Sequence, residues 1–376
     1  IIAGPAANYA LAFAGLAGFY LGFASEARPP YEGTQVQAGS AAERDYLPEA
    51  HGFDVNIAGN QRGMPGSYFH PFFWAPEWQA NLPPSEEGDY LTDVLTKAAI
   101  DQIEKWRDDP FFIYLPYYAV HTPIQGKEEY VEKFQAKIRP GMRHRNAEYA
   151  AMVRSLDESV GRIIAALERL GIREETLMIL TGDNGGLDPE DEGGITDNHP
   201  LRHGKGGVYE GGVRVPCVIS LPNHRSGVDD TPVITMDMAP TILSALGIPF
   251  EAEEFDGVDL MPLLRSDGDA LPPRDLFWHY PHYHVQGATP YSAIRSGDHR
   301  LIEYHRDGNV ELYDLAADPG ETRDLSRQRP DLVHQLRERL NAWRKRVDAQ
   351  MAIPNPNYNP KQPTVNPRLA RRNNDS

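Results

Sequence analysis

Two polar residues followed by two glycines are the clearest sign of a reactive site in this sequence. Asp183 and Asn184 come directly after the apolar run 176–181, and Gly185 and Gly186 follow them. A carboxylate and an amide oxygen are hard donors that suit Ca²⁺ or Mg²⁺, and glycine lets a backbone approach a ligand closely. A simple turn at the end of a strand uses the same residue types, so the local pattern leaves both interpretations open.

The glycine-rich segment 201–216 is a second candidate, with the sequence LRHGKGGVYEGGVRVP. Lys205 lies between Gly204 and Gly206, so its ammonium could meet a tetrahedral anion with little steric cover. The segment is not a Walker A loop, because the spacing and the final Ser or Thr of that motif are absent. An ordinary loop with a solvated lysine is the alternative.

His121 and Cys217 are single residues of a reactive type. His121 directly follows an apolar run and precedes a turn that contains Pro123. A lone histidine in this position is more often structural than functional. Cys217 is the only cysteine and lies in an apolar run, which predicts a buried core thiol. One cysteine excludes an intramolecular disulfide, and the sequence has no Cys/His spacing typical of a zinc site.

The elements that would position these residues alternate between helices and strands. Asp89 is expected to cap a helix with apolar positions at Leu91, Leu95, Ala98 and Ile103. A longer helix ends at Gly171, and its predicted apolar face comprises Tyr149, Val153, Leu156, Val160, Ile163, Leu167 and Leu170. Another helix is predicted at 238–246, and buried strands at 111–115, 176–181 and 213–220. The alternation predicts an α/β fold, a mainly parallel sheet flanked by helices.

The pattern changes after residue 256. Three short strands are predicted within 291–315, joined by turns at Gly297-Asp298 and Asp307-Gly308. A helix follows from Pro330, with apolar positions at Leu332, Leu336, Leu340 and Trp343. We therefore predict an α/β domain at 45–255, a small antiparallel sheet with one helix at 256–350, and a disordered tail at 351–376.

Residues 1–43 differ from the rest of the chain. Residues 1–24 carry no charge, and about 20 such residues span a bilayer as a helix, which predicts a transmembrane segment and membrane association. A signal peptide and a buried helix are the alternatives. The segment 1–43 resembles the membrane helix and PDZ start of site-2 metalloproteases, but their zinc motif H-E-x-x-H does not occur in the sequence.

Composition excludes one class of partner. The chain has 37 Lys and Arg against 54 Asp and Glu, a net charge of −17. Nucleic-acid binding needs clustered cations, so no nucleic-acid partner is expected.

From about residue 45 to about residue 360 the chain resembles the type I sulfatases of the alkaline-phosphatase superfamily. The specific motifs are D-N-G-G and G-K-G-x-x-Y-E-G-G, in this order. Further segments agree with the order of the family, namely LPEAHGFDVNIAG, PFFIYLPYYAVHTP, GVDLMPLL, FWHYPHYH and ELYDLAADPGETRDL. The resemblance implies an alkaline-phosphatase-like fold and Ca²⁺-dependent hydrolysis of sulfate esters, with a sulfated small molecule or glycan as partner.

The resemblance also implies roles for individual residues. Asp183 and Asn184 would be calcium ligands, and His121 and Lys205 would bind the sulfate as catalytic residues. Residues expected to line the substrate are Arg202, His203, Trp278, His279, His282 and His284; the alternative for the last four is a surface aromatic loop. Asp183 and Asn184 supply few of the six to eight oxygens that calcium takes, which predicts an affinity no better than about millimolar.

One part of the sulfatase pattern does not occur in the 376 residues. The family forms its formylglycine nucleophile in a Cys/Ser-x-Pro-x-Arg motif, whereas the nearest match, 220–225, has His224 where the motif requires Arg. The resemblance therefore predicts a sulfatase-like domain that is incomplete at its N-terminus and inactive or impaired as it stands. Two alternatives stay open: a membrane-tethered, non-catalytic binder of sulfated glycans, and a phosphodiester or phosphonate monoester hydrolase. A periplasmic or extracellular location, with membrane anchoring, is expected.

Overall fold

The computed structural model describes residues 9–10, 48–58, 64–73, 82–187, 195–221, 224, 226–265, 270–283, 288–351 and 353. It divides into two compact units. Unit 1 comprises Ile1–Thr181 and Pro216–Leu271, and unit 2 comprises Gly182–Val215 and Pro272–Ser376. The two units are described separately below.

Most of the predictions for the two ends of the chain lie outside the described residues. Of the predicted transmembrane segment 1–24, only Tyr9–Ala10 are described, as strand β1. In the described part of the chain, no helix has the length and apolar character needed to cross a membrane. Most of the tail 351–376 is likewise outside the description.

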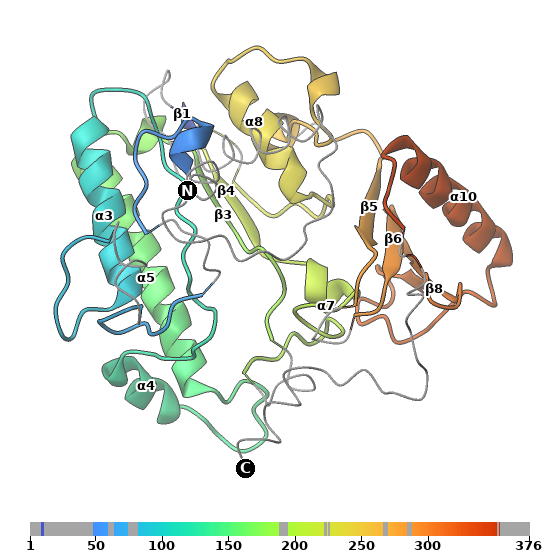
Figure 1. The fold of residues 1–376 in the computed structure, drawn as a ribbon, viewed down its shortest axis with the longest axis horizontal. Helices are drawn as coiled ribbons and strands as arrows, with labels where there is room; N and C mark the ends of the chain where they lie inside the picture. The colour runs from blue at the N-terminus through green and yellow to red at the C-terminus, as the bar shows by residue number, and fades with distance from the viewer. Residues whose placement is uncertain are drawn as a thin grey trace. The chain divides into compact units, whose positions relative to one another are not determined.

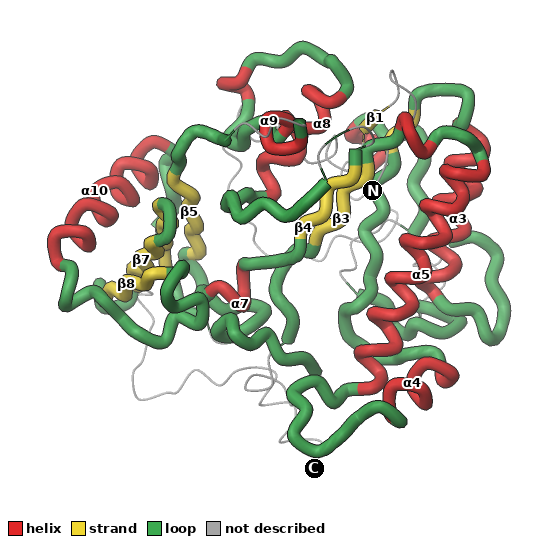
Figure 2. The backbone as a smooth tube through the Cα atoms, turned by 180° about the vertical axis from the view of Figure 1, so that it is seen from behind, coloured by secondary structure: helices red, strands yellow, loops and turns green. Residues whose placement is uncertain are grey.

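The described part of unit 1 is built mainly from helices around two apolar clusters. Its described helices are α3 (Leu91–Trp106), α4 (Glu128–Gln135), α5 (Ala147–Arg169), α8 (Met238–Ala245) and α9 (Met261–Leu264). Its described 3-10 turns are η1 (Pro48–His51), η3 (Arg173–Glu175), η4 (Thr235–Asp237) and η5 (Ala252–Glu254). The long helices α3 and α5 lie side by side (Figures 1 and 2). Ile103, Ile163, Leu167 and Ile242 meet in the core, as expected for amphipathic helices.

The strands of unit 1 are short. Strand β1 pairs in parallel with β2 (Phe111–Phe112), and β3 (Met178–Thr181) pairs antiparallel with β4 (Cys217–Ser220). The predicted burial of Cys217 is wrong, because Cys217 and Val218 are exposed and the core packs against Ile219 instead.

Two details of the predicted helices also need correction. Helix α3 begins after Tyr90 without a side-chain cap, and the predicted cap Asp89 instead accepts a hydrogen bond from the Glu86 N–H (2.8 Å). On α5, Val153 is 44% exposed. The buried face of α5 instead contains small residues four apart, Ala151, Ser155 and Ser159, which lets a neighbouring element approach closely. Gly171 ends the helix with φ +74°, as predicted.

Unit 2 contains a four-stranded antiparallel sheet with strand order β5-β6-β7-β8. The strands are β5 (Asp275–Tyr280), β6 (Tyr291–Ser296), β7 (His299–Tyr304) and β8 (Val310–Asp314), and the helices are α7 (Glu210–Val213) and α10 (Pro330–Arg346). The three predicted strands and the helix are present. The fourth strand, β5, forms where an aromatic loop was the alternative, because its backbone pairs with β6 over its whole length.

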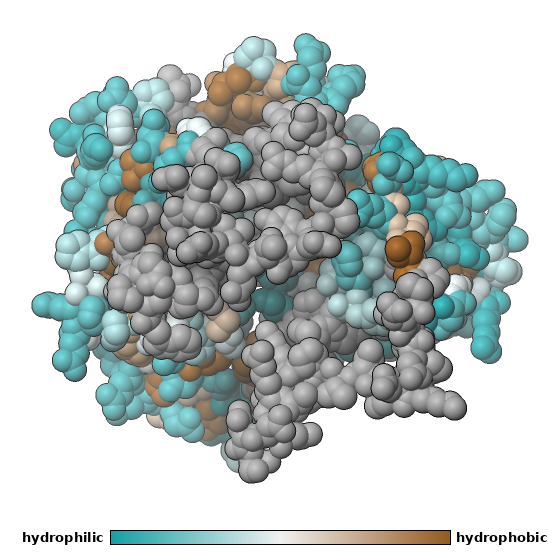
Figure 3. Space-filling view, in the orientation of Figure 1, coloured by the Kyte–Doolittle hydropathy of each residue, from teal (hydrophilic) through white to brown (hydrophobic). Residues whose placement is uncertain are grey.

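The two faces of this sheet are covered by different segments. Because side chains alternate along a strand, Ile294, Leu301 and Leu312 point to one face and pack against Leu336 and Leu340 of α10. The outer surface of α10 is hydrophilic (Figure 3). The neighbouring residues point to the other face and pack against Val208 and Tyr209; they are Ala293, Ile302 and Tyr313. We call these the α10 face and the loop face.

Candidate functional site

The two glycine-containing motifs are joined through their backbones. The Gly185 N–H donates to the Gly212 carbonyl, and the Lys205 N–H donates to the Gly186 carbonyl, each at 3.0 Å. Within the 202–212 segment, the Gly211 N–H donates to the Arg202 carbonyl at 3.0 Å. The segment after β3 that carries Asp183 and the segment that carries Lys205 therefore form one backbone frame.

The glycines are required because the two segments touch through main-chain atoms. A Cβ on Gly185 would lie 1.7 Å from the Gly211 carbonyl oxygen, and one on Gly212 would lie 2.3 Å from the Gly207 oxygen. A Cβ on Gly211 would lie 2.1 Å from the carbonyl oxygen of His203. A side chain at Gly185 would force the two segments apart, and one at Gly211 or Gly212 would disrupt the fold of the 202–212 segment itself.

Asn198 is a further part of this frame that the sequence did not reveal. Its side-chain amide donates to the carbonyl oxygens of Gly186 (2.9 Å) and His203 (3.0 Å), one in each segment. It lies in no recognisable motif, so only the three-dimensional contact identifies it. The amide therefore bridges the two segments and reinforces the backbone hydrogen bond between Lys205 and Gly186.

Asp183 and Lys205 keep their charged groups unpaired within this frame. Asp183 is exposed, and Asn184 and Lys205 are partly buried. Neither the Asp183 carboxylate nor the Lys205 ammonium forms a hydrogen bond or ion pair with any residue that the structure describes. A carboxylate and an ammonium held in one frame and left unpaired are suited to bind a cation and an anion, respectively.

The donor set fits a divalent cation only in part. The Asp183 carboxylate and the Asn184 amide supply hard oxygens of the type that calcium prefers. The described ranges contain no group of three or more His, Cys, Asp or Glu residues that could hold a metal. The two predicted ligands thus fit a calcium ion as part of a larger oxygen set, and their role remains a prediction.

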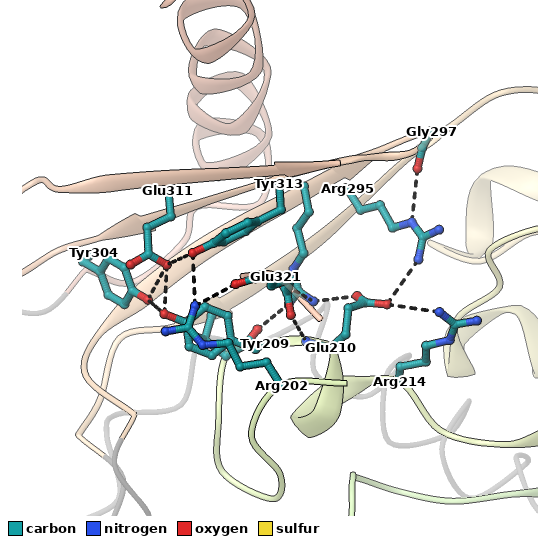
Figure 4. A network of polar contacts seen from close by, with 12 residues as sticks. Arg202, Tyr209, Glu210, Arg214, Arg295, Gly297, Tyr304, Glu311, Tyr313 and Glu321 are labelled. Atoms are coloured by element: carbon teal, nitrogen blue, oxygen red, sulfur yellow. Dashed lines mark hydrogen bonds and ion pairs between the residues drawn. The ribbon is translucent and has the colours of Figure 1, made fainter. Parts of the chain in front are cut away.

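Arg202 and His203 turn toward the loop face of the sheet. The Arg202 guanidinium lies 3.7 Å from the centre of the Tyr209 ring and donates to the Tyr313 hydroxyl (3.2 Å) and the Glu321 carbonyl (3.0 Å; Figure 4). His203 has φ +61°, and its ring centre lies 5.3 Å from that of Tyr209. The hydrogen bond to Tyr313 attaches the segment to the sheet, and substrate binding by Arg202 or His203 remains a prediction.

Of the histidines predicted after residue 278, His279 points away from the loop face, on which the Lys205 segment packs. His279 points to the α10 face, where its Nδ1 lies 2.8 Å from Ser292 Oγ and its Nε2 lies 2.7 Å from the Gln350 carbonyl oxygen. His282 is exposed beyond the end of β5, and His284 lies outside the described residues. Trp278 does point to the loop face, with the Arg300 guanidinium 5.1 Å from its ring centre. Substrate contacts of His279 and His282 stay predictions.

His121 belongs to unit 1. Its Nδ1 lies 3.0 Å from the carbonyl oxygen of Thr122, and its backbone N–H donates to the Tyr118 carbonyl at 2.8 Å. The ring is partly buried. The predicted convergence of His121 with Lys205 on one sulfate therefore remains a prediction.

His305, which lies on the α10 face beside His279, is expected to make the stability of unit 2 depend on pH. Burial, followed by the charges of His279 and Arg344, lowers the pKa of His305 to about 4. Because the ordinary pKa is about 6.5, the unfolded chain binds more protons than the folded chain between pH 6.5 and 4. Stability from this group is therefore lost as the pH falls through that range.

We expect His305→Gln to remove this pH dependence. Between pH 7 and pH 5 the free energy of unfolding of the native chain should fall by about 1–2 kcal/mol more than that of the variant. Urea unfolding at both pH values measures the difference. Equal losses in the native chain and the variant would show that His305 is not held neutral.

Comparisons with known proteins bear on the whole arrangement. A family model described as "Sulfatase" matches residues 29–248, and one described as "N-sulphoglucosamine sulphohydrolase, C-terminal" matches residues 202–346. The second match begins at Arg202, so it includes both the Lys205 segment and the sheet on which it packs.

Individual relatives agree with the family models. The chain is 35% identical over 291 residues to a sulfatase of Formosa agariphila, a match that covers 70% of this chain and 52% of that protein. It is 30% identical over 279 residues to arylsulfatase A of Homo sapiens, a match that covers 66% of this chain and 51% of that protein. The chain thus spans about half the length of these curated relatives.

A solved structure shares the fold. The crystal structure of Ps i-CgsB in complex with k-i-k-neocarrahexaose is similar with a TM-score of 0.64 and 25% identity, over 80% of this chain and 68% of that chain. The predicted α/β fold class is confirmed by this similarity together with the C-terminal antiparallel sheet.

Proposed function

The chain belongs to the sulfatase family, and from this premise we propose that it binds the sulfate group of a sulfate ester at the Asp183–Lys205 frame. The observation that supports the proposal is the interlocking of the two segments, which holds in one backbone unit a carboxylate and an ammonium that have no partner among the described residues. Lys205 would meet the sulfate oxygens as a fixed positive charge.

Hydrolysis of the ester is the reaction that this arrangement supports best. The oxygen of water bonds to sulfur as the S–O bond to the leaving group breaks, which gives sulfate, the free alcohol and one proton. Preorganised cations stabilise the charge of the sulfate group and of the departing oxygen. A divalent cation held through Asp183 and Asn184 would supply further charge stabilisation when bound. The main chain at Lys205 is held in place, because its backbone N–H donates to the Gly186 carbonyl.

We propose a sulfated carbohydrate as the substrate class and a periplasmic or extracellular location. The neocarrahexaose complex of the similar structure supports a carbohydrate.

The sulfatase nucleophile motif does not occur in these 376 residues. We therefore propose that the chain as given turns over sulfate esters weakly or not at all. That observation also favours a second candidate function, the binding of sulfated glycans without turnover.

An aryl sulfate assay in the presence of Ca²⁺, combined with a binding assay for inorganic sulfate, separates the two candidates. Weak hydrolysis that disappears in Asp183→Ala would support the hydrolase. Sulfate binding without hydrolysis, weakened in Asp183→Ala, would support the binder. A chain that neither binds sulfate nor hydrolyses the ester would contradict both, and faster hydrolysis of a matched phosphate ester would move the proposal to phosphate chemistry.

A further inference from the structure

A buried ion pair anchors the end of the Lys205 segment to the sheet. Glu210 is 2% exposed and Arg300, on β7, is fully buried. The Arg300 Nη1 donates to Glu210 Oε1 at 2.6 Å, while Arg295 and Arg214 lie 3.5 and 3.8 Å from Glu210 Oε2 (Figure 4). The ion pair joins residues 90 positions apart.

Glu321 holds the same segment at two further points. It is fully buried with φ +49°, and its Oε2 accepts the Glu210 N–H at 2.6 Å. Its carbonyl oxygen accepts from Arg202 at 3.0 Å, and its Oε1 lies 3.8 Å from Arg300 Nη1. The segment is thereby fixed on both sides of Lys205, at Arg202 and at Glu210.

A tyrosine cluster adds a third attachment beside Lys205. Glu311 Oε2 accepts the hydroxyls of Tyr209 (2.9 Å), Tyr304 (3.2 Å) and Tyr313 (3.0 Å; Figure 4). Only Tyr209 belongs to the segment, and its ring also carries the Arg202 guanidinium. The attachments thus converge on residues 202–210, which surround Lys205.

The α10 face offers an internal comparison. It has its own buried glutamate, Glu303, which is 7% exposed and pairs with Arg337 (2.5 Å) and Arg344 (2.7 Å) of α10. This cluster has the same chemistry but contacts α10 and not the Lys205 segment. Buried ion pairs contribute little net stability compared with apolar packing, whereas they can fix one specific arrangement.

We propose that Glu210 and Arg300 are positioning residues that hold the Lys205 segment in its sulfate-binding conformation, so that the C-terminal sheet sets the sulfate affinity of the site. The inference rests on the proposed function. It assigns the sheet a role in binding without requiring any of its side chains to touch the ligand.

The test compares Glu210→Gln with Glu303→Gln in the full chain. Each variant removes one buried carboxylate charge that pairs with arginine, so both should lower the thermal unfolding midpoint. Calorimetric titration with inorganic sulfate in the presence of Ca²⁺ should show at least a tenfold weaker affinity for Glu210→Gln and a change within twofold for Glu303→Gln. Equal sulfate affinity in the two variants would overturn the proposal.

A double variant separates positioning from stability. Glu210→Gln combined with Arg300→Met removes both charges of the pair. Glu321, whose pKa burial raises to about 7, can take up a proton once Arg300 is absent, so the unfolding midpoint should recover toward the native value. Sulfate affinity should stay low, because the anchor is still absent. Recovery of affinity together with stability would overturn the proposal.

The milder Tyr209→Phe, which removes one hydroxyl, should fold and still weaken sulfate binding severalfold. Native affinity in this variant would also count against the proposal.

The Lys205→Ala variant shows which claim has failed. If Lys205→Ala abolishes sulfate binding while Glu210→Gln, the double variant and Tyr209→Phe retain it, the positioning role is wrong and the proposed function stands. If the native chain and Lys205→Ala bind sulfate equally, or neither binds it, the proposed function fails and the inference fails with it.

Discussion

Replacing Gly211 by alanine should abolish sulfate binding. The added Cβ would lie 2.1 Å from the His203 carbonyl oxygen and 2.4 Å from that of Arg202. Both are backbone atoms, so the clash can be relieved only by displacing the segment that carries Lys205. Overpacking of this kind costs about 1–3 kcal/mol or more. Circular dichroism melting and sulfate titration measure the loss of stability and of binding.

Gly161→Ala is the matched control. Gly161 lies within α5, and a Cβ there would meet nothing within 4 Å. Alanine is favoured over glycine in a helix, so this variant should be more stable by about 0.5–1 kcal/mol and bind sulfate as the native chain does. If Gly211→Ala behaved like Gly161→Ala, the interlocked frame would not be a requirement of the site.

Replacing Lys205 by alanine should weaken sulfate binding about 10- to 100-fold, because a hydrogen bond to a charged group contributes about 1.5–3 kcal/mol. The loss should occur without a loss of stability, because Lys205 pairs with no charged group in the described part of the chain. Sulfate titration and thermal melting of the same samples test both statements.

Lys97→Ala is the control for the removal of a positive charge. Lys97 forms an exposed pair with Asp101 on α3 at 2.6 Å, and exposed pairs of this kind contribute about 0.3–0.5 kcal/mol. Sulfate affinity should therefore change less than twofold. Comparable losses in Lys97→Ala and Lys205→Ala would mean that net charge, and not the position of Lys205, governs binding.

Local sequence patterns predicted where helices and strands lie better than they predicted which residues are buried and which strands pair. Apolar spacing located α3, α5, α8 and α10 because each helix is amphipathic over its own residues. Which residues of a helix face the core depends on the elements that pack against it, and Val153 of α5 is exposed for that reason. Strand β5 was missed as a strand because its pairing with β6 is a contact between segments that no local pattern records.

In the candidate site, too, the sequence predicted local features but not the contacts between distant segments. The glycines around Asp183 and Lys205 predicted a close backbone approach, but the sequence could not show that each segment approaches the other. The pairing of Glu210 with Arg300 joins two residues far apart in the chain, each of which is an ordinary charged residue by sequence. Arg202 was expected to meet substrate, whereas its visible contacts are with the sheet.

The central claim is that one frame presents a cation site at Asp183 and an anion site at Lys205, so the binding of Ca²⁺ and of sulfate should be coupled. Coupling between sites is reciprocal. Calorimetric titration of the native chain with sulfate, without Ca²⁺ and with saturating Ca²⁺, should show about a tenfold or larger gain in sulfate affinity when Ca²⁺ is bound. Identical sulfate affinities under the two conditions would contradict the claim.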